Sequence, residues 1–194
     1  MLAPRHPAAS SRPARMAPMS AQMSSRSALE TALREIELHV ADDGWDQPTR
    51  LFALVSTQEL LAQEPSLIAE LLDGQEPPLL TSVEQADLPD HEDLTDLLAR
   101  VSWPDAVLGI AIVAERIMLP SDADTELPSG LAAARHAAMS DPGRHEMRIA
   151  AATMRDGSRF CLLRLREHDA TDLVLAGPEL ISGLADMLHQ SLLA

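Results

Sequence analysis

The sequence predicts an α+β domain built on an antiparallel sheet, and three observations support this class. Asp156-Gly157 separates two apolar runs, 146–155 and 158–166, which is a strong signal for a β-hairpin. A nearly continuous apolar run at 107–118 is rich in β-branched residues and typical of a central strand buried on both faces. Strands and helices do not alternate as β-α-β units, so a doubly wound parallel fold is not expected.

The first 26 residues differ in composition from the rest of the chain. They contain Arg5, Arg12, Arg15 and Arg26, four prolines and no acidic residue. They lack the apolar segment of a secretory signal, so a disordered N-terminal tail is expected over residues 1–26. A start codon assigned too far upstream and a basic targeting tail are the two alternatives. A single domain is expected over residues 27–194.

Residues 27–60 are expected to form a helix, a strand and the start of a second helix. Ser27 and Glu30 match a capping box, and apolar residues then recur at helical spacing until Asp42-Asp43-Gly44. A short apolar strand is expected at 50–55. Ser56–Glu59 forms a second capping box, which predicts that a helix begins there.

The remaining elements are predicted from residues that end helices and from the spacing of apolar residues. Helical segments are predicted at 66–72, as one turn at 81–84, at 91–101, at 129–138, and after Gly177-Pro178-Glu179. The expected sheet has about four strands, 50–55, 107–118, 146–155 and 158–166, with the helices packed on one face. A two-residue turn in the late hairpin would pair Arg148 with Leu165, and Ile149 with Arg164.

Charge and cysteine content restrict the function classes. The chain carries 30 acidic and 15 basic residues, a net charge of −15, which disfavours nucleic acid or an anionic membrane as the main partner. Every basic residue is Arg, and Lys, Asn and Tyr are absent, as expected from a GC-rich genome. Cys161 is the only cysteine, so a cytoplasmic protein with a buried, inert thiol is expected. No apolar run reaches the length of a membrane helix.

Motifs for catalysis or cofactor binding are missing. The sequence contains no phosphate-binding glycine loop, nucleophile elbow, zinc-protease helix or Cys-x-x-Cys pair, so no catalytic residue and no cofactor is predicted. His136, His145 and His168 are candidates to approach one another near the end of the sheet. Their spacing matches no metal site, so separate surface histidines are expected and no metal is predicted.

The late hairpin concentrates arginine in an otherwise acidic chain. Six arginines lie between Arg144 and Arg166, a stretch with only two acidic residues. One interpretation is a surface for an anion or an acidic partner, because guanidinium groups bind carboxylate and phosphate in a bidentate manner. The other is that the arginines pair with the protein's own acidic helices. The candidate binding residues are Arg164, Arg166, Arg148, Arg116 and Glu115.

Two further features are expected to be structural. Glu115-Arg116 lies inside the apolar run at 107–118, where adjacent side chains point to opposite faces and a buried charge requires a partner. A buried ion pair is therefore expected there. Trp45 and Trp103 each lie close to a proline in a loop, and we expect both to be packing anchors.

Several of these segments together resemble an actinobacterial family of conserved proteins of unknown function. The resemblance covers roughly residue 28 to the C-terminus. It rests on Gly44-Trp45-Asp46-Gln47-Pro48, Val83-Glu84-Gln85 before Leu88-Pro89, Trp103-Pro104, Glu115-Arg116, Arg155-Asp156-Gly157, Leu163-Arg164-Leu165-Arg166 and Gly177-Pro178-Glu179-Leu180. The resemblance implies an actinobacterial source and a shared domain without the first 26 residues. It implies no activity and no site residues.

Two functions are expected from the sequence. The first is a non-enzymatic cytoplasmic module that binds an unknown protein partner or forms a homodimer. The alternative is a small enzyme or binding protein that holds an anionic metabolite in an arginine-lined pocket. Nucleic-acid binding is a third and weaker hypothesis, because the arginines lie in a strongly acidic chain with few aromatic residues.

Overall fold

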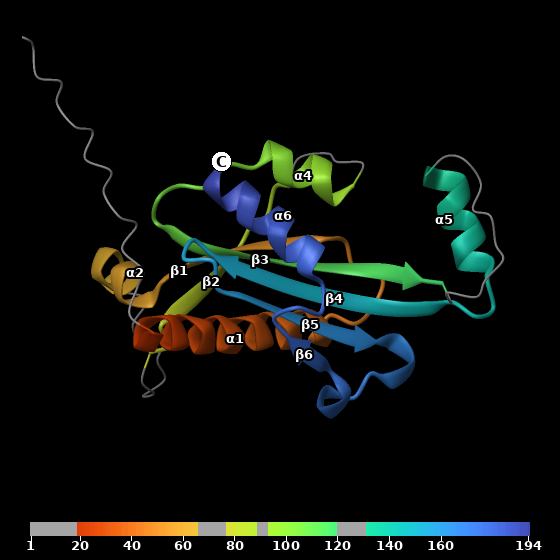
Figure 1. Cartoon of the computed structure of the whole chain (residues 1–194), viewed down its shortest axis with the longest axis horizontal. Helices are drawn as coiled ribbons and strands as arrows, with labels where there is room; N and C mark the ends of the chain where they lie inside the picture. Colours follow the sequence, from red (N-terminus) through yellow and green to blue (C-terminus); the bar gives the residue numbers. More distant parts are fainter. Residues whose placement is uncertain (1–18, 66–76, 89–92, 120–130) are drawn as a thin grey trace, which may run out of the picture.

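The computed structural model describes residues 19–65, 77–88, 93–119 and 131–194, and within them the chain forms a six-stranded antiparallel sheet (Figure 1). The strand order is β2-β1-β3-β4-β5-β6, and all neighbouring strands are antiparallel. The α+β class is therefore confirmed. The strands are β1 (Arg50–Ser56), β2 (Leu80–Glu84), β3 (Val107–Met118), β4 (His145–Met154), β5 (Arg159–Leu165) and β6 (Leu175–Gly177).

Helices cover both faces of this sheet. Leu33 and Ile36 of α1 form one buried core with Phe52 and Phe160, whereas Leu97 of α4 and residues of α6 form a second core on the other face. The prediction that helices pack on one face is wrong. Each buried leucine contributes about 1.5–3 kcal/mol, so a strand that is apolar on both sides requires cover on both sides. The helices are α1 (Met19–Asp42), α2 (Thr57–Gln63), α4 (Leu94–Arg100), α5 (Leu131–Ser140) and α6 (Ser182–Leu193).

Two edge strands were not predicted. Residues 81–84 belong to β2, where Thr81 pairs with Val55 of β1, and they do not form a helical turn. The short strand β6 pairs with β5, and α6 begins at Ser182, after the predicted Gly177-Pro178-Glu179 start. Both strands are short and rely on pairing with a distant strand, which local patterns do not encode. The predicted helix at 66–72 lies outside the described residues.

Of the two predicted capping boxes, only the second one caps a helix. The Ser56 side chain accepts a hydrogen bond from the Glu59 amide, so the second capping box is confirmed. Ser27 does not cap α1, because the helix already begins at Met19 and the Ser27 carbonyl accepts a hydrogen bond from the Thr31 hydroxyl. Residues 19–26, which precede Ser27, are thus helical, although they fall within the predicted tail.

The late hairpin forms as predicted, but its turn and its register differ. The Met154 amide donates to the Ser158 carbonyl, which leaves a three-residue loop in which Gly157 has φ +86°. A glycine in this left-handed region is typical of three-residue hairpin loops, so the predicted two-residue turn is wrong. Arg148 consequently pairs with Arg164, and both side chains lie on the α1 face of the sheet.

Gly109 in β3 is expected to tolerate no side chain. A Cβ atom at this position would lie 2.7 Å from the Thr153 carbonyl oxygen and 3.1 Å from Cγ of Met154. The first contact is with the backbone of β4, so the two strands would have to separate. We expect Gly109→Ala to lower the free energy of unfolding by about 1–3 kcal/mol in a urea titration. Gly183→Ala is the control, because its Cβ would meet nothing within 4 Å. Equal stability of the two variants would contradict this expectation.

Cys161 lies in the second core and is fully buried. Burial raises the pKa of its thiol above the ordinary value, which favours the unreactive protonated form. The expectation of a small hydrophobic side chain is confirmed. No helix within the described residues is long and apolar enough to cross a membrane.

Candidate functional site

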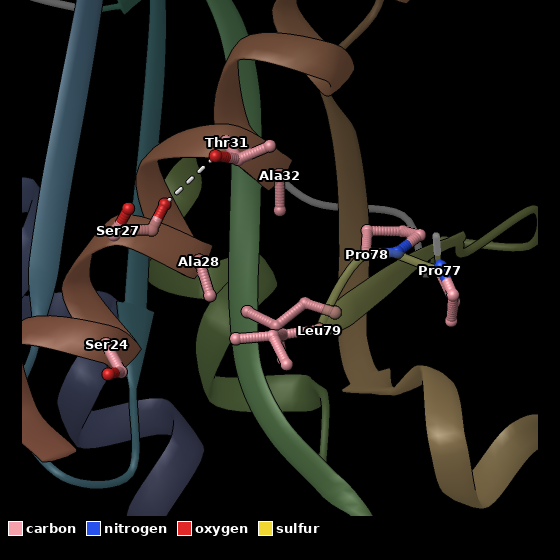
Figure 2. A pocket seen from close by; sticks show the side chains of 9 residues that line it. Ser24, Ser27, Ala28, Thr31, Ala32, Pro77, Pro78 and Leu79 are labelled. Atoms are coloured by element: carbon pink, nitrogen blue, oxygen red, sulfur yellow. Dashed lines mark hydrogen bonds between the residues drawn. The ribbon is translucent and has the colours of Figure 1, made fainter. Parts of the chain in front are cut away.

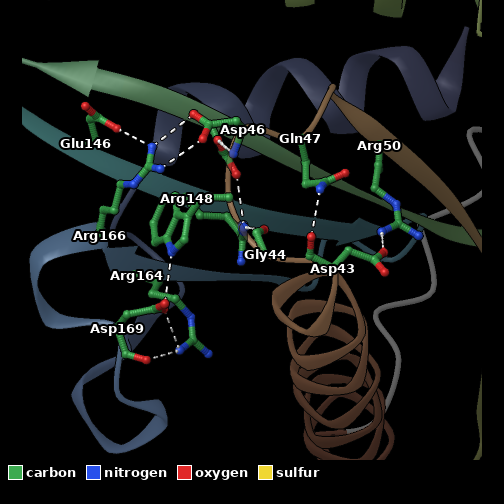
Figure 3. A network of polar contacts seen from close by, with 12 residues as sticks. Asp43, Gly44, Asp46, Gln47, Arg50, Glu146, Arg148, Arg164, Arg166 and Asp169 are labelled. Carbon is green, nitrogen blue, oxygen red and sulfur yellow. Dashed lines mark hydrogen bonds and ion pairs between the residues drawn. The ribbon is translucent and has the colours of Figure 1, made fainter.

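The hairpin register brings two buried arginines together beneath the loop that follows α1 (Figure 3). We call the group the Trp45 cluster. Its members come from the end of α1, the loop at 43–46, β3, β4, β5 and the turn after β5. They are Glu37, Trp45, Asp46, Glu115, Glu146, Arg148, Arg164, Arg166 and Asp169.

Arg164 and Glu37 form a buried bidentate ion pair at the base of the cluster. Arg164 Nε lies 2.6 Å from one carboxylate oxygen of Glu37, and Nη2 lies 2.8 Å from the other. The exposed fractions of the two side chains are only 2% and 4%. The hydrogen bonds to Glu37 raise the pKa of Arg164 above its ordinary value. The remaining nitrogen, Nη1, donates to the Asp169 carbonyl, so each of the three guanidinium nitrogens has a partner inside the protein.

Arg148 is more deeply buried and less completely paired. Its Nη2 donates to Glu115 at 3.0 Å and to the Gly44 carbonyl, and the guanidinium lies 4.5 Å from the centre of the Trp45 ring. Nε and Nη1 are buried and have no hydrogen-bond partner among the described residues. The predicted buried ion pair at Glu115 is thus present, with Arg148 as its partner.

The loop at 43–46 is held over these arginines by several separate contacts. The Asp46 amide donates to the second oxygen of Glu115 at 2.8 Å, and Trp45 Nε1 donates to Asp169 at 2.9 Å. The backbone of Asp46 is in the left-handed region, with φ 68°. Arg166 donates two hydrogen bonds of 2.9 Å to the Asp46 carboxylate. Trp45 is therefore a packing anchor, as predicted. The sequence did not predict that its ring covers Arg148.

The structure brings together four of the five predicted binding residues. Arg148, Arg164, Arg166 and Glu115 all belong to the Trp45 cluster. Arg116 follows Glu115 on β3 and therefore points to the opposite face, where its guanidinium donates to the Glu115 carbonyl. Among the described residues, no group of histidine, cysteine and carboxylate side chains is arranged to hold a metal ion.

Glu37 was missed by the sequence interpretation, although a signal for it exists. It follows Ile36 on the apolar side of α1 and lies one helical turn after Leu33. A carboxylate among core positions of a helix requires a buried cation. The cation is Arg164. The predicted hairpin register is wrong by one residue and places Arg148 and Arg164 on opposite faces of the sheet, so it did not indicate a group of buried arginines near Glu37.

The Trp45 cluster is a network of ion pairs and hydrogen bonds between groups of the protein itself. Arg164 and Arg166 each contact two carboxylates, and Arg148 contacts one together with a carbonyl. None of these arginines lines the two cavities described below. The cluster fixes the loop at 43–46 to the sheet.

An apolar groove lies elsewhere, between the N-terminal half of α1 and the segment that leads into β2 (Figure 2). Its volume is about 590 Å³. Leu79 lines the groove, and 67% of this residue is exposed. The lining residues are Ser24, Ser27, Ala28, Thr31, Ala32, Pro77, Pro78, Leu79 and Leu80. A smaller cavity of about 60 Å³ lies between α1 and β5.

The groove adjoins one edge of the sheet. β2 is the outermost strand on that side, and within the described ranges no strand pairs with its outer edge. Val83 of this strand is 42% exposed. An open strand edge beside exposed apolar side chains is a surface on which another polypeptide can pair.

Acid is expected to weaken the contacts that Arg166 makes to the loop and to β4. Hydrogen bonds from Arg166 lower the pKa of Asp46 and of Glu146 below their ordinary values. A carboxylate with a lowered pKa in the folded state stabilises the fold above its unfolded pKa, about 4, and this contribution disappears as the pH falls through the folded value. The urea midpoint should therefore decline below pH about 4.

A double variant tests this assignment. In Asp46→Asn with Glu146→Gln, the difference in urea midpoint between pH 7 and pH 3 should be smaller than in the wild type, because two linked protonations are gone. Glu59→Gln, on an exposed position of α2, serves as the control. Identical pH profiles for the wild type and the double variant would exclude these two carboxylates as the cause.

Comparison with known proteins gives one match. No curated protein and no solved structure is significantly similar to the chain. The family model described as PPA1309-like protein matches residues 29–193, a region that contains the whole sheet, the Trp45 cluster and most of the groove. The chain therefore belongs to the PPA1309-like protein family.

Proposed function

We propose that this protein is a non-enzymatic module that binds another polypeptide, with the groove and the adjoining strand β2 as its binding surface. The observation that carries this proposal is the exposure of Leu79 in a groove of about 590 Å³ beside an open strand edge. Apolar side chains exposed in this way favour a partner that covers them. We also propose a cytoplasmic location, supported by the single buried cysteine.

The lining of the groove favours a polypeptide as the partner. Ala28, Ala32 and Leu79 provide an apolar floor and wall, and the hydroxyl groups of Ser27 and Thr31 lie along α1. None of the described residues that line the groove is charged, so these residues offer an anionic metabolite no counter-charge. An apolar side chain of a partner would gain about 25 cal/mol for each Å² that it buries.

Site-specific photo-crosslinking tests the proposal. A photoreactive benzoylphenylalanine replaces Thr31, which is exposed and lines the groove, and the control places it at Leu173, which is 52% exposed in the segment between β5 and β6. After illumination in the native host, crosslinks from position 31 should identify one defined polypeptide, either a second copy of this chain or a different protein. Crosslinks from position 173 should not identify it.

A binding measurement with purified proteins completes this test. Leu79→Asp should weaken binding of the crosslinked partner at least tenfold, because a charge would be buried in the groove. Leu173→Asp is the matched control and should bind like the wild type. The proposal fails if position 31 captures no defined polypeptide, or if Leu79→Asp binds the captured one with unchanged affinity.

One observation supports the alternative function, a binding protein for an anionic metabolite. Arg148 Nε and Nη1 have no hydrogen-bond partner among the described residues, and Trp45 covers that guanidinium. An anion reaching them would have to displace Trp45, which would change the tryptophan fluorescence. Titration with phosphate and with citrate tests this function, with Trp45→Phe as the control. A fluorescence signal that stays constant in both titrations excludes it.

A further inference from the structure

The backbone of β2 is arranged so that a second copy of the same strand fits its open edge. The hydrogen bonds from the Thr57 amide to Leu79 and from the Gln85 amide to Leu51 continue the β1–β2 register. In an antiparallel ladder, every second residue exchanges both of its bonds with the neighbouring strand. The odd-numbered residues of β2 therefore point to β1, and the even-numbered ones direct N–H and C=O outward.

The outward-pointing residues form a self-complementary set. They are Leu80, Ser82 and Glu84, which are evenly spaced about Ser82. A twofold axis at Ser82 pairs Ser82 with Ser82 of the second copy, and Leu80 with Glu84 of the second copy. Each pair consists of residues whose backbone groups point outward, so each pair can exchange two hydrogen bonds. A register shifted by one residue would oppose groups that are already used in the β1–β2 ladder.

The side chains of β2 are compatible with the same register. Glu84 would face Leu80 and not another carboxylate, and its charge is already paired with Arg50 at 2.6 Å. On the opposite face Val83 would lie beside Thr81 of the second copy, a pair of β-branched residues that suits neighbouring strands. Pro78 has no N–H at the next outward position, so the ladder ends there.

We propose that two copies of this chain associate through antiparallel pairing of their β2 strands about Ser82, which joins the two sheets into one. This inference rests on the proposed function and names the partner as a second copy of the chain. An isologous contact uses the same patch on both subunits, and twofold dimers are the commonest soluble oligomers. Pairing at this edge would also place the second copy beside the groove, where Leu80 belongs to both surfaces.

A cysteine scan of β2 tests the register directly. In the proposed dimer, Ser82→Cys places two thiols on residues whose Cα atoms are about 5.5 Å apart, within the range of a disulfide. For Thr81→Cys and Val83→Cys the equivalent atoms are diagonal neighbours about 7–8 Å apart. Cys161 is buried and does not compete. Under mild oxidation the disulfide-linked fraction should be several-fold higher for Ser82→Cys than for its neighbours.

A proline substitution tests association without a crosslink. Light scattering of the wild type should show a mass that rises with concentration toward twice the 21.0 kDa of the chain. Ser82→Pro removes an outward N–H that the β1–β2 ladder does not use, so the variant should fold and remain a monomer. Ser82→Ala retains the N–H and should associate like the wild type. Circular dichroism of both variants monitors folding.

The outcomes separate this inference from the proposed function. A wild type that stays monomeric at all concentrations overturns the dimer, and so does a disulfide maximum away from position 82. If the groove nevertheless captures a different polypeptide in the photo-crosslinking experiment, the proposed function stands and only the identity of the partner was wrong. If neither a second copy nor another polypeptide is captured, both proposals fail.

Discussion

Glu37→Ala is expected to lower the free energy of unfolding by about 3–5 kcal/mol. The substitution removes both bidentate bonds to Arg164, and it leaves a guanidinium that is 98% buried without its main counter-charge. Desolvation of that charge is then uncompensated, which is the costly way to break a buried ion pair. Urea denaturation monitored by circular dichroism measures the loss, and the melting temperature should fall by roughly 10 °C.

Two further variants separate charge from packing in this prediction. Glu35→Ala on the same helix is the matched control, because Glu35 is exposed and its loss should change stability by about 0.5 kcal/mol or less. Replacing both partners, in Glu37→Leu with Arg164→Met, should cost less than Glu37→Ala alone, since no unpaired buried charge remains. A double variant as unstable as the sum of its single variants would contradict the role assigned to the pair.

Arg148→Ala is expected to have a similarly large effect, about 3–5 kcal/mol. Arg148 is 1% exposed, so truncation leaves a cavity beneath Trp45 and removes the counter-charge of Glu115. The loop at 43–46 also loses the contact to the Gly44 carbonyl. Because Trp45 is one of only two tryptophans, its emission should shift toward longer wavelength as the ring becomes hydrated.

The unpaired nitrogens of Arg148 give this prediction an internal comparison. Arg148→Met retains most of the buried volume and removes Nε and Nη1, which have no partner among the described residues. It should therefore be clearly less destabilising than Arg148→Ala. Arg159→Ala, in which a partly exposed pair with Asp186 is lost, is the surface control and should cost at most about 1 kcal/mol. If Met and Ala at position 148 are equally destabilising, packing against Trp45 is not the main contribution.

Sequence patterns predicted the elements whose signals are local. The run at 107–118 coincides with β3, and Ser56 caps α2 as its pattern indicates. β2 and β6 were not predicted, because such short strands are defined by the strands beside them. The apolar pattern of β3 on both of its faces indicates helices on both faces of the sheet, as the structure has them. Gly157 indicated a hairpin, but whether its loop holds two or three residues depends on the pairing of the whole strand.

The sequence indicated which arginines to consider as candidate binding residues, but it did not predict how they are arranged or which carboxylates they contact. Arg148, Arg164 and Arg166 were selected because arginine is concentrated in the hairpin, and the structure brings them together with carboxylates from α1, β3 and the loop at 43–46. Glu37 is 127 residues away from Arg164 in the sequence. No periodicity connects positions that far apart, so partners of this kind follow only from the packing of α1 on the sheet.

The pairing of Arg148 with Arg164 also has a consequence for how the chain selects its fold. A slip of one residue between β4 and β5 would turn one of these arginines toward the opposite core, where Leu188 and Ile112 offer no counter-charge. Alanine-rich β4 provides little shape to discriminate between neighbouring alignments. We therefore expect the two charges to raise the free energy of hairpins with a shifted register. Such misaligned hairpins would be disfavoured during folding, before the helices pack on the sheet.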